Sequence, residues 1–276
     1  MEKKKAYFVQ SKRYVIMPAM LLACICGVLV LTARLGNGSM QPEPVFIEDT
    51  GIGTEGKAVL LNDGNAFFRS AAVQFDGKVV VAGSNRGNFA LARYNSDGSP
   101  DIDFGGGGEV ITDFGAFDYA LAVAVQADGK IVAAGGSGGN FALARYRSDG
   151  SLDDTFGSGG KVISDMGGYD QVRAIALQAD GKIVAAGGSA GADDNRFGLA
   201  RYNGDGSPDH AFGKKGMVTI GSNGDLWAHS VTVQPDGKIV AAGERVKGGE
   251  NDFFLVRCRN DGSPDTYFGE GGKVGQ

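Results

Sequence analysis

Arginine and aspartate recur at a fixed spacing of eight residues. The pairs are Arg93/Asp101, Arg145/Asp153, Arg201/Asp209 and Arg257/Asp265. A cation and an acid facing each other across a short turn predict an ion pair that fixes the turn. The alternative is a calcium loop, because residues 95–101 place two aspartates around Gly98. Arg93 stands where the first calcium ligand is needed, so we adopt the ion pair and predict no metal.

A second set of acids lies in segments that differ from one copy of this pattern to the next. There they are interleaved with aromatic residues, which stack on rings while carboxylates accept hydrogen bonds. Loops on a rigid scaffold often hold binding sites, although loop drift with solvated acids is the alternative. The candidate ligand-binding residues are Asp113, Asp118, Tyr119, Asp165, Asp170, Asp193, Asp194, Trp227, Glu250 and Asp252.

Catalytic motifs are not visible in the sequence. His210 and His229 lack metal-ligand spacing, and neither is paired with a cysteine or serine nucleophile. The stretch GSGGKV at 157–162 lacks the glycine spacing and the Ser or Thr of a phosphate loop. We therefore predict a protein that is not an enzyme and that uses no cofactor.

These residues belong to a repeat of 52–56 residues that occurs four times. Each unit holds four short apolar runs bounded by Gly, Asp, Asn or Ser, and none is long enough for a helix. The Asp-Gly between the first two runs predicts a tight hairpin. Four antiparallel strands in each unit predict an all-β fold, a β-propeller over residues 57–276. In the second unit the runs are 120–126, 130–136, 141–146 and 161–164.

The repeated phrases also resemble a known family. ARYNSDGSPD, TFGSGGKV and QADGKIVAAGG are similar to the delta-60 repeat, and the resemblance covers residues 57–274. It implies a bacterial β-propeller of unknown function. KIVAAGG followed by FALARY is also loosely similar to a kelch blade. The resemblance therefore implies a fold without an activity.

The sequence leaves open how the propeller closes. Residues 57–61 align with the fourth run of the other units, so they are placed to complete the last blade and close the ring. Residues 273–276 begin a competing copy of the same run. Either the ring closes with a redundant tail, or the chain is a partial propeller that self-associates through its edge strands.

The N-terminal segment differs in kind from the repeats. Basic residues precede an uncharged run of nineteen residues, 15–33, which at about 1.5 Å per residue crosses a bilayer of about 30 Å. The excess of cations before the run places the N-terminus in the cytoplasm. A cleaved signal peptide, giving a secreted protein, and a lipoprotein signal ending at Cys24 are alternatives. We predict a cytoplasmic segment (1–13), a single-pass membrane anchor (14–35), a linker (36–56) and an extracytoplasmic repeat domain (57–276).

The charge of the sequence limits the classes of partner that the protein is expected to bind. Residues 1–34 contain six Lys and Arg and one Glu, so the remainder has 21 cations against 31 acids. Phosphate binding needs clustered cations, so nucleic acid is not an expected partner. Cys258 stands where the other units have tyrosine, which predicts a core substitution.

The function expected from these features is a binding or scaffolding module of the cell envelope. Its partner would be an unknown protein or glycan, bound through the face that holds the variable loops. Two alternatives belong to other classes of protein. One is an envelope hydrolase or lyase acting on glycans or lactones, and the other is a structural surface protein that self-assembles.

Overall fold

The computed structural model describes residues 66–190, 195–221 and 224–275. The predicted cytoplasmic segment, membrane anchor and linker lie outside these ranges, as do residues 57–65 of the repeat domain. None of the described residues forms a helix long and apolar enough to span a membrane. The structure therefore describes the repeat domain alone.

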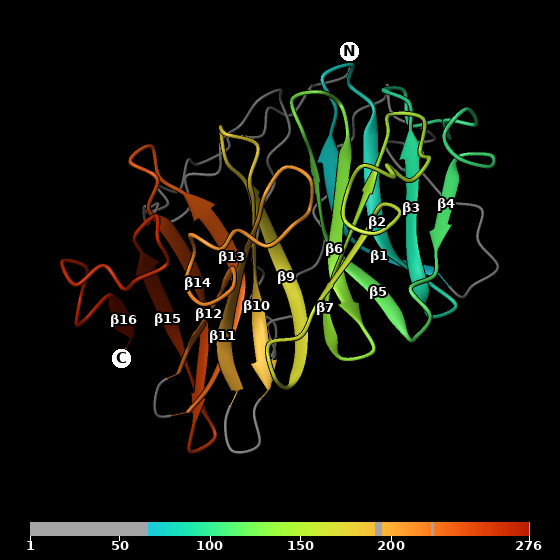
Figure 1. The fold of residues 1–276 in the computed structure, drawn as a ribbon. Helices are drawn as coiled ribbons and strands as arrows, with labels where there is room; N and C mark the ends of the chain where they lie inside the picture. Colours follow the sequence, from blue (N-terminus) through green and yellow to red (C-terminus); the bar gives the residue numbers. More distant parts are fainter. Residues whose placement is uncertain (1–65, 191–194, 222–223, 276) are drawn as a thin grey trace, which may run out of the picture. The chain divides into compact units, whose positions relative to one another are not determined.

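The described residues form four antiparallel sheets of four strands, one sheet per repeat (Figure 1). Strands that follow one another in the chain are neighbours in each sheet, which confirms the predicted all-β blades. The first sheet contains β1 (Ala66–Val73), β2 (Val79–Asn85), β3 (Asn88–Tyr94) and β4 (Glu109–Thr112). The second contains β5 (Asp118–Val125), β6 (Ile131–Ser137), β7 (Asn140–Tyr146) and β8 (Lys161–Ser164).

The last two sheets repeat this order. The third contains β9 (Tyr169–Leu177), β10 (Ile183–Ala190), β11 (Asn195–Tyr202) and β12 (Met217–Ile220). The fourth contains β13 (Asp225–Val233), β14 (Ile239–Lys247), β15 (Glu250–Cys258) and β16 (Lys273–Gly275). β16, the C-terminal copy of the run, takes the fourth place in its sheet, and residues 57–61 lie outside the described ranges.

The predicted hairpin turns are present in all four repeats. In the second, Gly129 adopts a φ of 82°, a conformation open to glycine at no steric cost. Its amide donates to the carbonyl of Gln126 at 2.9 Å. The Asp-Gly pair therefore sets the register between the first two strands of each sheet.

A β-bulge interrupts the first strand of every sheet at the same place. Contacts between sheets are concentrated on these four first strands, which we call the inner strands. The second strand places a glycine opposite each bulge, and at Gly187 a Cβ atom would lie 1.8 Å from the carbonyl oxygen of Gln171. A bulge re-aims the side chain of the extra residue. The bulged residues are Arg69, Leu121, Arg173 and His229.

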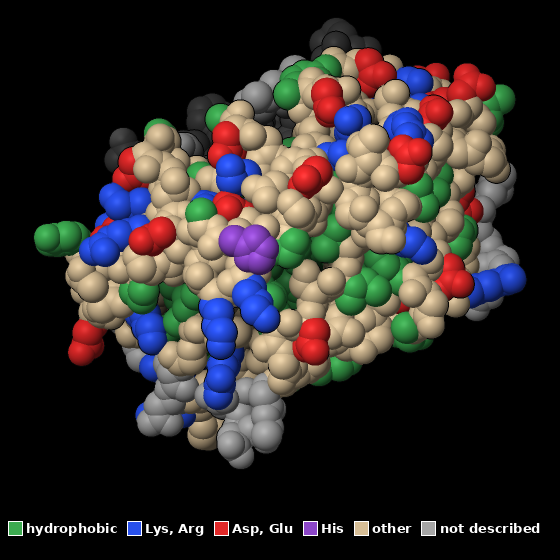
Figure 2. All heavy atoms as spheres, in the orientation of Figure 1, with side chains coloured by type: hydrophobic (Ala, Val, Ile, Leu, Met, Phe, Trp, Pro, Cys, Tyr) green, Lys and Arg blue, Asp and Glu red, His purple; other side chains and the backbone are tan. Residues whose placement is uncertain are grey.

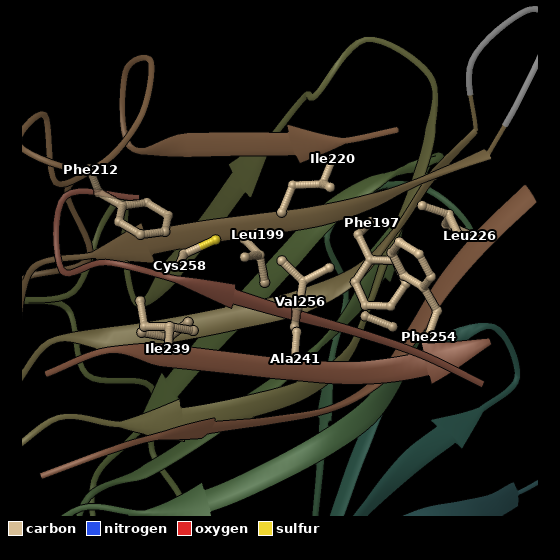
Figure 3. Packing of buried hydrophobic residues seen from close by; sticks show 13 residues of the cluster. Phe197, Leu199, Phe212, Ile220, Leu226, Ile239, Ala241, Phe254, Val256 and Cys258 are labelled. Atoms are coloured by element: carbon tan, nitrogen blue, oxygen red, sulfur yellow. The ribbon is translucent and has the colours of Figure 1, made fainter. Parts of the chain in front are cut away.

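Neighbouring sheets pack face to face through apolar clusters. Each sheet has a forward face, directed at the next repeat, and a backward face, directed at the previous one. Between the third and fourth sheets, Phe197 and Leu199 of the forward face meet Ile239 and Val256 of the backward face (Figure 3). The same positions form the two preceding interfaces. Repetition of one sequence thus produces three similar interfaces.

One buried pair varies between these interfaces in a correlated way. Tyr146 donates its hydroxyl to Thr112 at 2.8 Å, and Tyr202 donates to Ser164 at 2.9 Å. Ile220 occupies the acceptor position at the next interface, and Cys258 replaces the tyrosine. Because Ile220 offers no hydrogen-bond acceptor, a buried tyrosine there would lose its partner. The predicted core substitution is confirmed, and burial raises the pKa of Cys258 to about 11.

The first and last sheets form the two ends of this series. Within the described ranges, the extensive sheet-to-sheet packing joins consecutive repeats, and it does not join the inner strands β13 and β1. Figure 1 shows β4 and β16 at opposite sides of the array. The described sheets therefore form an open series with two end faces.

Candidate functional site

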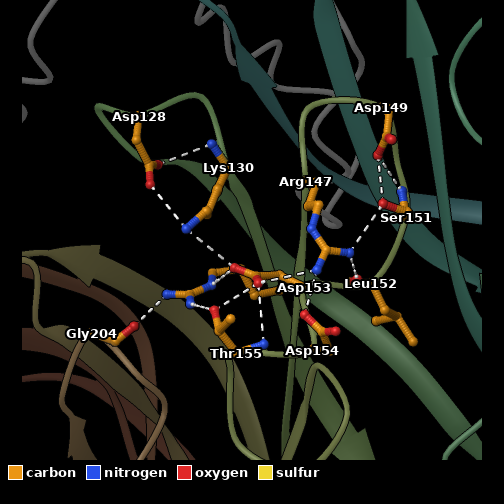
Figure 4. A network of polar contacts seen from close by, with 11 residues as sticks. Asp128, Lys130, Arg147, Asp149, Ser151, Leu152, Asp153, Asp154, Thr155 and Gly204 are labelled. Atoms are coloured by element: carbon orange, nitrogen blue, oxygen red, sulfur yellow. Dashed lines mark hydrogen bonds and ion pairs between the residues drawn. The ribbon is translucent and has the colours of Figure 1, made fainter.

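The predicted ion pairs form in all four repeats. The Arg Nε to Asp Oδ2 distances are 2.6, 2.8, 2.7 and 2.8 Å in chain order. In the second repeat the Arg145 guanidinium lies 4.6 Å from the centre of the Phe156 ring. It donates to the carbonyl of Gly204 in the turn after β11 of the next sheet (Figure 4). Each arginine in the first three repeats thus links its own turn to the neighbouring sheet.

The acids of these turns are engaged within the protein. Burial would raise the pKa of Asp153, but the hydrogen bonds from Thr155 and the charge of Arg145 hold it well below its usual value. Asp97 accepts from the backbone amide of Ser99 at 2.9 Å. In the described part of the chain, no cluster of three or more His, Cys, Asp or Glu side chains is placed to hold a metal. The ion-pair interpretation of the spacing is therefore the one that the contacts support.

Two of the predicted ligand-binding acids lie beneath the surface. Asp118 and Asp170 are fully buried. Their Oδ2 atoms accept from the backbone amides of Phe114 and Met166, each at 2.7 Å. Their Oδ1 atoms have no hydrogen-bond partner. In this conformation both residues hold the connection that precedes an inner strand, so we assign them a positioning role.

The other predicted acids are dispersed. Asp113 and Asp165 are exposed, and each accepts from a backbone amide two residues on, at 2.6 and 2.7 Å. Glu250 and Asp252 lie on β15, where Asp252 pairs with Arg245 at 3.2 Å. Residues 193 and 194 lie outside the described ranges. These acids do not converge on one point among the described residues.

Tyr119 and Trp227 are the predicted site residues that the structure places in polar clusters. Tyr119 donates to Gln171 Oε1 at 3.3 Å, and its oxygen lies 3.1 Å from the hydroxyl of Tyr169. Burial, followed by the hydrogen bond to Tyr169, raises the pKa of Tyr119. Tyr169 is 52% exposed, so its ring is accessible to solvent.

A second group surrounds Trp227. The Arg173 guanidinium lies 4.6 Å from the Trp227 ring centre, and its Nη1 lies 3.1 Å from His229 Nδ1. His229 Nε2 lies 3.1 Å from Glu244 Oε1. Burial lowers the pKa of Arg173, opposed by the charge of Glu244. An arginine of this kind still remains protonated.

The two groups belong to one surface of the inner strands. Gln171 of the first group and Arg173 of the second lie two residues apart on β9, so the two groups are neighbours. We call the seven residues the inner-strand cluster. Its members are Tyr119, Tyr169, Gln171, Arg173, Trp227, His229 and Glu244.

Sequence reasoning missed most of this cluster because it searched the variable loops rather than the strands. Strand pairing aligns Phe67, Tyr119, Gln171 and Trp227 at one position of the four repeats. A second position holds the four bulged residues, and a third holds Ser84, Gly136, Gly188 and Glu244. A position-by-position comparison of the repeats would have found them, since side chains differ here while the surrounding residues are repeated.

The arrangement offers hydrogen-bond donors and acceptors, a cation and an exposed ring. Donor and acceptor rules assign the proton of His229 to Nε2, because Arg173 can only donate to Nδ1. Both ring nitrogens are then engaged, one by Arg173 and one by Glu244. On the face in view in Figure 2, acidic and basic side chains are interspersed. The cluster is suited to bind a polar ligand that contains a ring and a negative charge.

Known structures give distant likenesses only. A virginiamycin B lyase from Staphylococcus aureus is 13% identical with a TM-score of 0.41, and the alignment covers 74% of this chain and 59% of that one. An endo-arabinase from Bacteroides thetaiotaomicron is 10% identical with a TM-score of 0.41, covering 71% and 75% of the two chains. This chain thus spans about three fifths of the lyase. At these values the likenesses say nothing about activity, and a search of curated proteins finds no match.

The repeats themselves match a protein family. The matching model is described as "Domain of unknown function (DUF5122) beta-propeller". It matches residues 74–104, 126–156, 178–212 and 234–268. Each segment runs from the first hairpin of a sheet to the phenylalanine on which the arginine of the ion pair stacks. The more specific resemblance to the delta-60 repeat stays a prediction. Four segments of the chain are therefore similar to the repeat that this family model describes, and the model assigns that repeat no function.

Proposed function

We propose that this protein is a non-catalytic binding module that recognises its ligand through the inner-strand cluster beneath the variable loops. The repeat domain is held outside the cytoplasm by residues 14–35. The tether rests on the uncharged run and on the cations before it. A chain that lacks residues 1–35 should move from the membrane fraction to the soluble fraction.

The observation that supports this proposal is the departure from the repeat at the cluster. Most scaffold positions repeat the same or a similar residue in the blades, whereas Tyr119, Gln171 and Trp227 share one position and differ in chemistry. Their neighbours, such as Gly135, Gly187 and Gly243, are identical. Differences in chemistry at one end of strands whose other positions are mostly similar indicate recognition rather than folding.

The ligand class follows from the groups that the cluster presents. Tyr169 offers a half-exposed ring for stacking, and Gln171 and Tyr119 offer polar atoms in fixed positions. Arg173 offers a guanidinium whose geometry matches a carboxylate. A glycan that contains a uronic acid combines these features, so we propose an acidic oligosaccharide as the ligand.

A hydrolase or lyase is the second candidate, and the His229–Glu244 contact of 3.1 Å favours it, since such a pair can orient a general base. The base would need a free lone pair on His229. Arg173 lies 3.1 Å from Nδ1, the only nitrogen with a lone pair in this tautomer. We therefore prefer binding without turnover.

The test is an array of neutral and uronic-acid oligosaccharides probed with the full chain in detergent. We expect binding to uronic-acid sugars, reduced at least tenfold by Arg173→Gln. The matched control is Arg69→Gln, the same substitution at the same bulge position in the first sheet, where the guanidinium stacks on Phe67. Equal losses in both variants, or no binding to any acidic sugar, would contradict the proposal. Shortened products in the same incubation would identify the enzyme instead.

A further inference from the structure

The forward face of the last sheet is built like an interface, but among the described strands no sheet packs against it. Val240, Phe253 and Leu255 stand at the positions that Val184, Phe197 and Leu199 hold in the third sheet. The three residues of the third sheet are fully buried. Phe253, by contrast, is 52% exposed, and Val240 and Leu255 are partly exposed. The fourth sheet thus presents apolar residues that the repeat elsewhere covers with another sheet.

The arginine of the last ion pair shows the same difference. Its counterparts Arg93, Arg145 and Arg201 each donate to a backbone carbonyl in the turn of the following sheet. Their side chains are 8%, 6% and 4% exposed, whereas that of Arg257 is 20% exposed. Arg257 forms its ion pair with Asp265 but has no following sheet to donate to in the described chain.

A backbone hydrogen bond identifies the position at which each of the first three sheets binds a turn of the following sheet. The amides of Gly105, Gly157 and Gly213 donate to the carbonyl of an aspartate in the next sheet, at 2.8, 2.7 and 2.8 Å. Gly269 is the fourth member of this series. Together with Val274, the counterpart of the Val110 that Gly150 approaches, it lines a surface hollow. The hollow corresponds to the place where the other three repeats receive an Asp-Gly turn.

Within the described residues, the first sheet offers a turn and a face of the required kind. Val73 is 63% exposed on β1, and Val79 and Val81 on β2 are partly exposed. Their counterparts in the second sheet, Val125, Ile131 and Ala133, pack into an interface. Asp97 also accepts from Ser99 as Asp149 does from Ser151, each at 2.9 Å. The part of this face at Val73, Val79 and Val81 thus has the chemistry that the last sheet needs in a neighbour, whereas Ala92 and Tyr94 on the same face are already buried.

We propose that the forward face of the last sheet binds the backward face of the first sheet in a second copy of this chain. Arg257 would donate to the carbonyl of Ser96, and Gly269 to that of Asp97, as their counterparts do within the chain. Such a head-to-tail contact closes into a ring when the rotation permits. Two copies of four sheets give eight blades, at the upper end of the ordinary propeller range of about four to eight.

The experiment measures the mass of the full chain in detergent by size exclusion with light scattering. We expect the mass of two chains for the native sequence. Phe253→Lys on the forward face and Val73→Lys on the backward face should each give the mass of one chain. The control is Ile163→Lys, which is matched to Phe253 in exposure at 52% but lies on β8, away from both end faces. It should keep the mass of two chains.

Mixing the two monomeric variants tests the head-to-tail arrangement directly. Each retains one native face, so the forward face of the Val73→Lys chain can bind the backward face of the Phe253→Lys chain. We expect the mixture to regain the mass of two chains. A native protein with the mass of one chain, or a mixture that stays at that mass, would overturn the proposal. Circular dichroism of each variant confirms that a loss of mass does not come from unfolding.

Discussion

The turns that follow the third strands and the ends of the inner strands place opposite demands on the same repeat. In the turns, an arginine, an aspartate and a phenylalanine recur with nearly the same geometry in every sheet. At the inner-strand ends, equivalent positions hold Phe67, Tyr119, Gln171 and Trp227. Repetition indicates a structural requirement of every blade, and its local absence indicates where the molecule is free to specialise.

Breaking one turn pair should have the largest effect on stability. Arg145→Leu leaves Asp153 buried without its guanidinium partner and removes the link to Gly204. We expect a loss of about 3–5 kcal/mol in the free energy of unfolding, measured with urea. A second substitution, Asp153→Leu, should restore part of the loss because it removes a buried carboxylate whose remaining cations, Lys130 and Arg147, lie 3.3 and 3.9 Å away. A loss below about 1 kcal/mol would mean that the pair is not the structural element we infer.

The correlated pair at the third interface offers a sharper test. Cys258→Tyr places a hydroxyl against Ile220, and we expect it to cost about 1–3 kcal/mol. Adding Ile220→Ser recreates the pair seen between Tyr202 and Ser164. The double-mutant cycle should therefore show a favourable coupling of about 1 kcal/mol. Additive effects would show that the hydroxyl pair does not explain the substitution.

Acid should weaken the turns. Hydrogen bonds and nearby cations outweigh burial and lower the pKa of Asp101, Asp153 and Asp265. A lowered folded-state pKa contributes stability that is present above the unfolded pKa, about 3.9, and is lost as the pH falls below it. The melting temperature should thus hold between pH 7 and 5 and fall below about pH 4. Asp153→Asn should show a shallower fall, and an unchanged slope would exclude Asp153 as a contributor.

The smallest effect on stability is expected at the inner-strand cluster. His229 and Arg173 lie at the surface and contribute polar contacts rather than core packing. Arg173→Gln and His229→Gln should change the free energy of unfolding by less than about 0.5 kcal/mol each. A loss of more than 2 kcal/mol would assign the cluster to the scaffold and weaken the contrast with the turns.

The fold was predictable because local sequence signals mark the strands and turns of each blade. The Asp-Gly turns, the apolar runs and the eight-residue Arg–Asp spacing correspond to hairpins, strands and ion pairs in the structure. The cluster was not, because its members come from different sheets, as with the contact between Arg173 and His229. Burial was equally hidden, since Asp118 and Asp113 look alike in sequence but only Asp118 is enclosed. Loop variation drew attention away from side chains that change within repeated strands.

Copying one repeat into another tests the central claim most directly. Trp227→Tyr, His229→Leu and Glu244→Gly together give the fourth sheet the residues that the second holds at these positions, Tyr119, Leu121 and Gly136. The loops stay unchanged. Titration of the preferred uronic-acid oligosaccharide should show an affinity at least tenfold lower than that of the native chain, while the urea midpoint is maintained. Native affinity in this variant would contradict the account and place recognition in the loops instead.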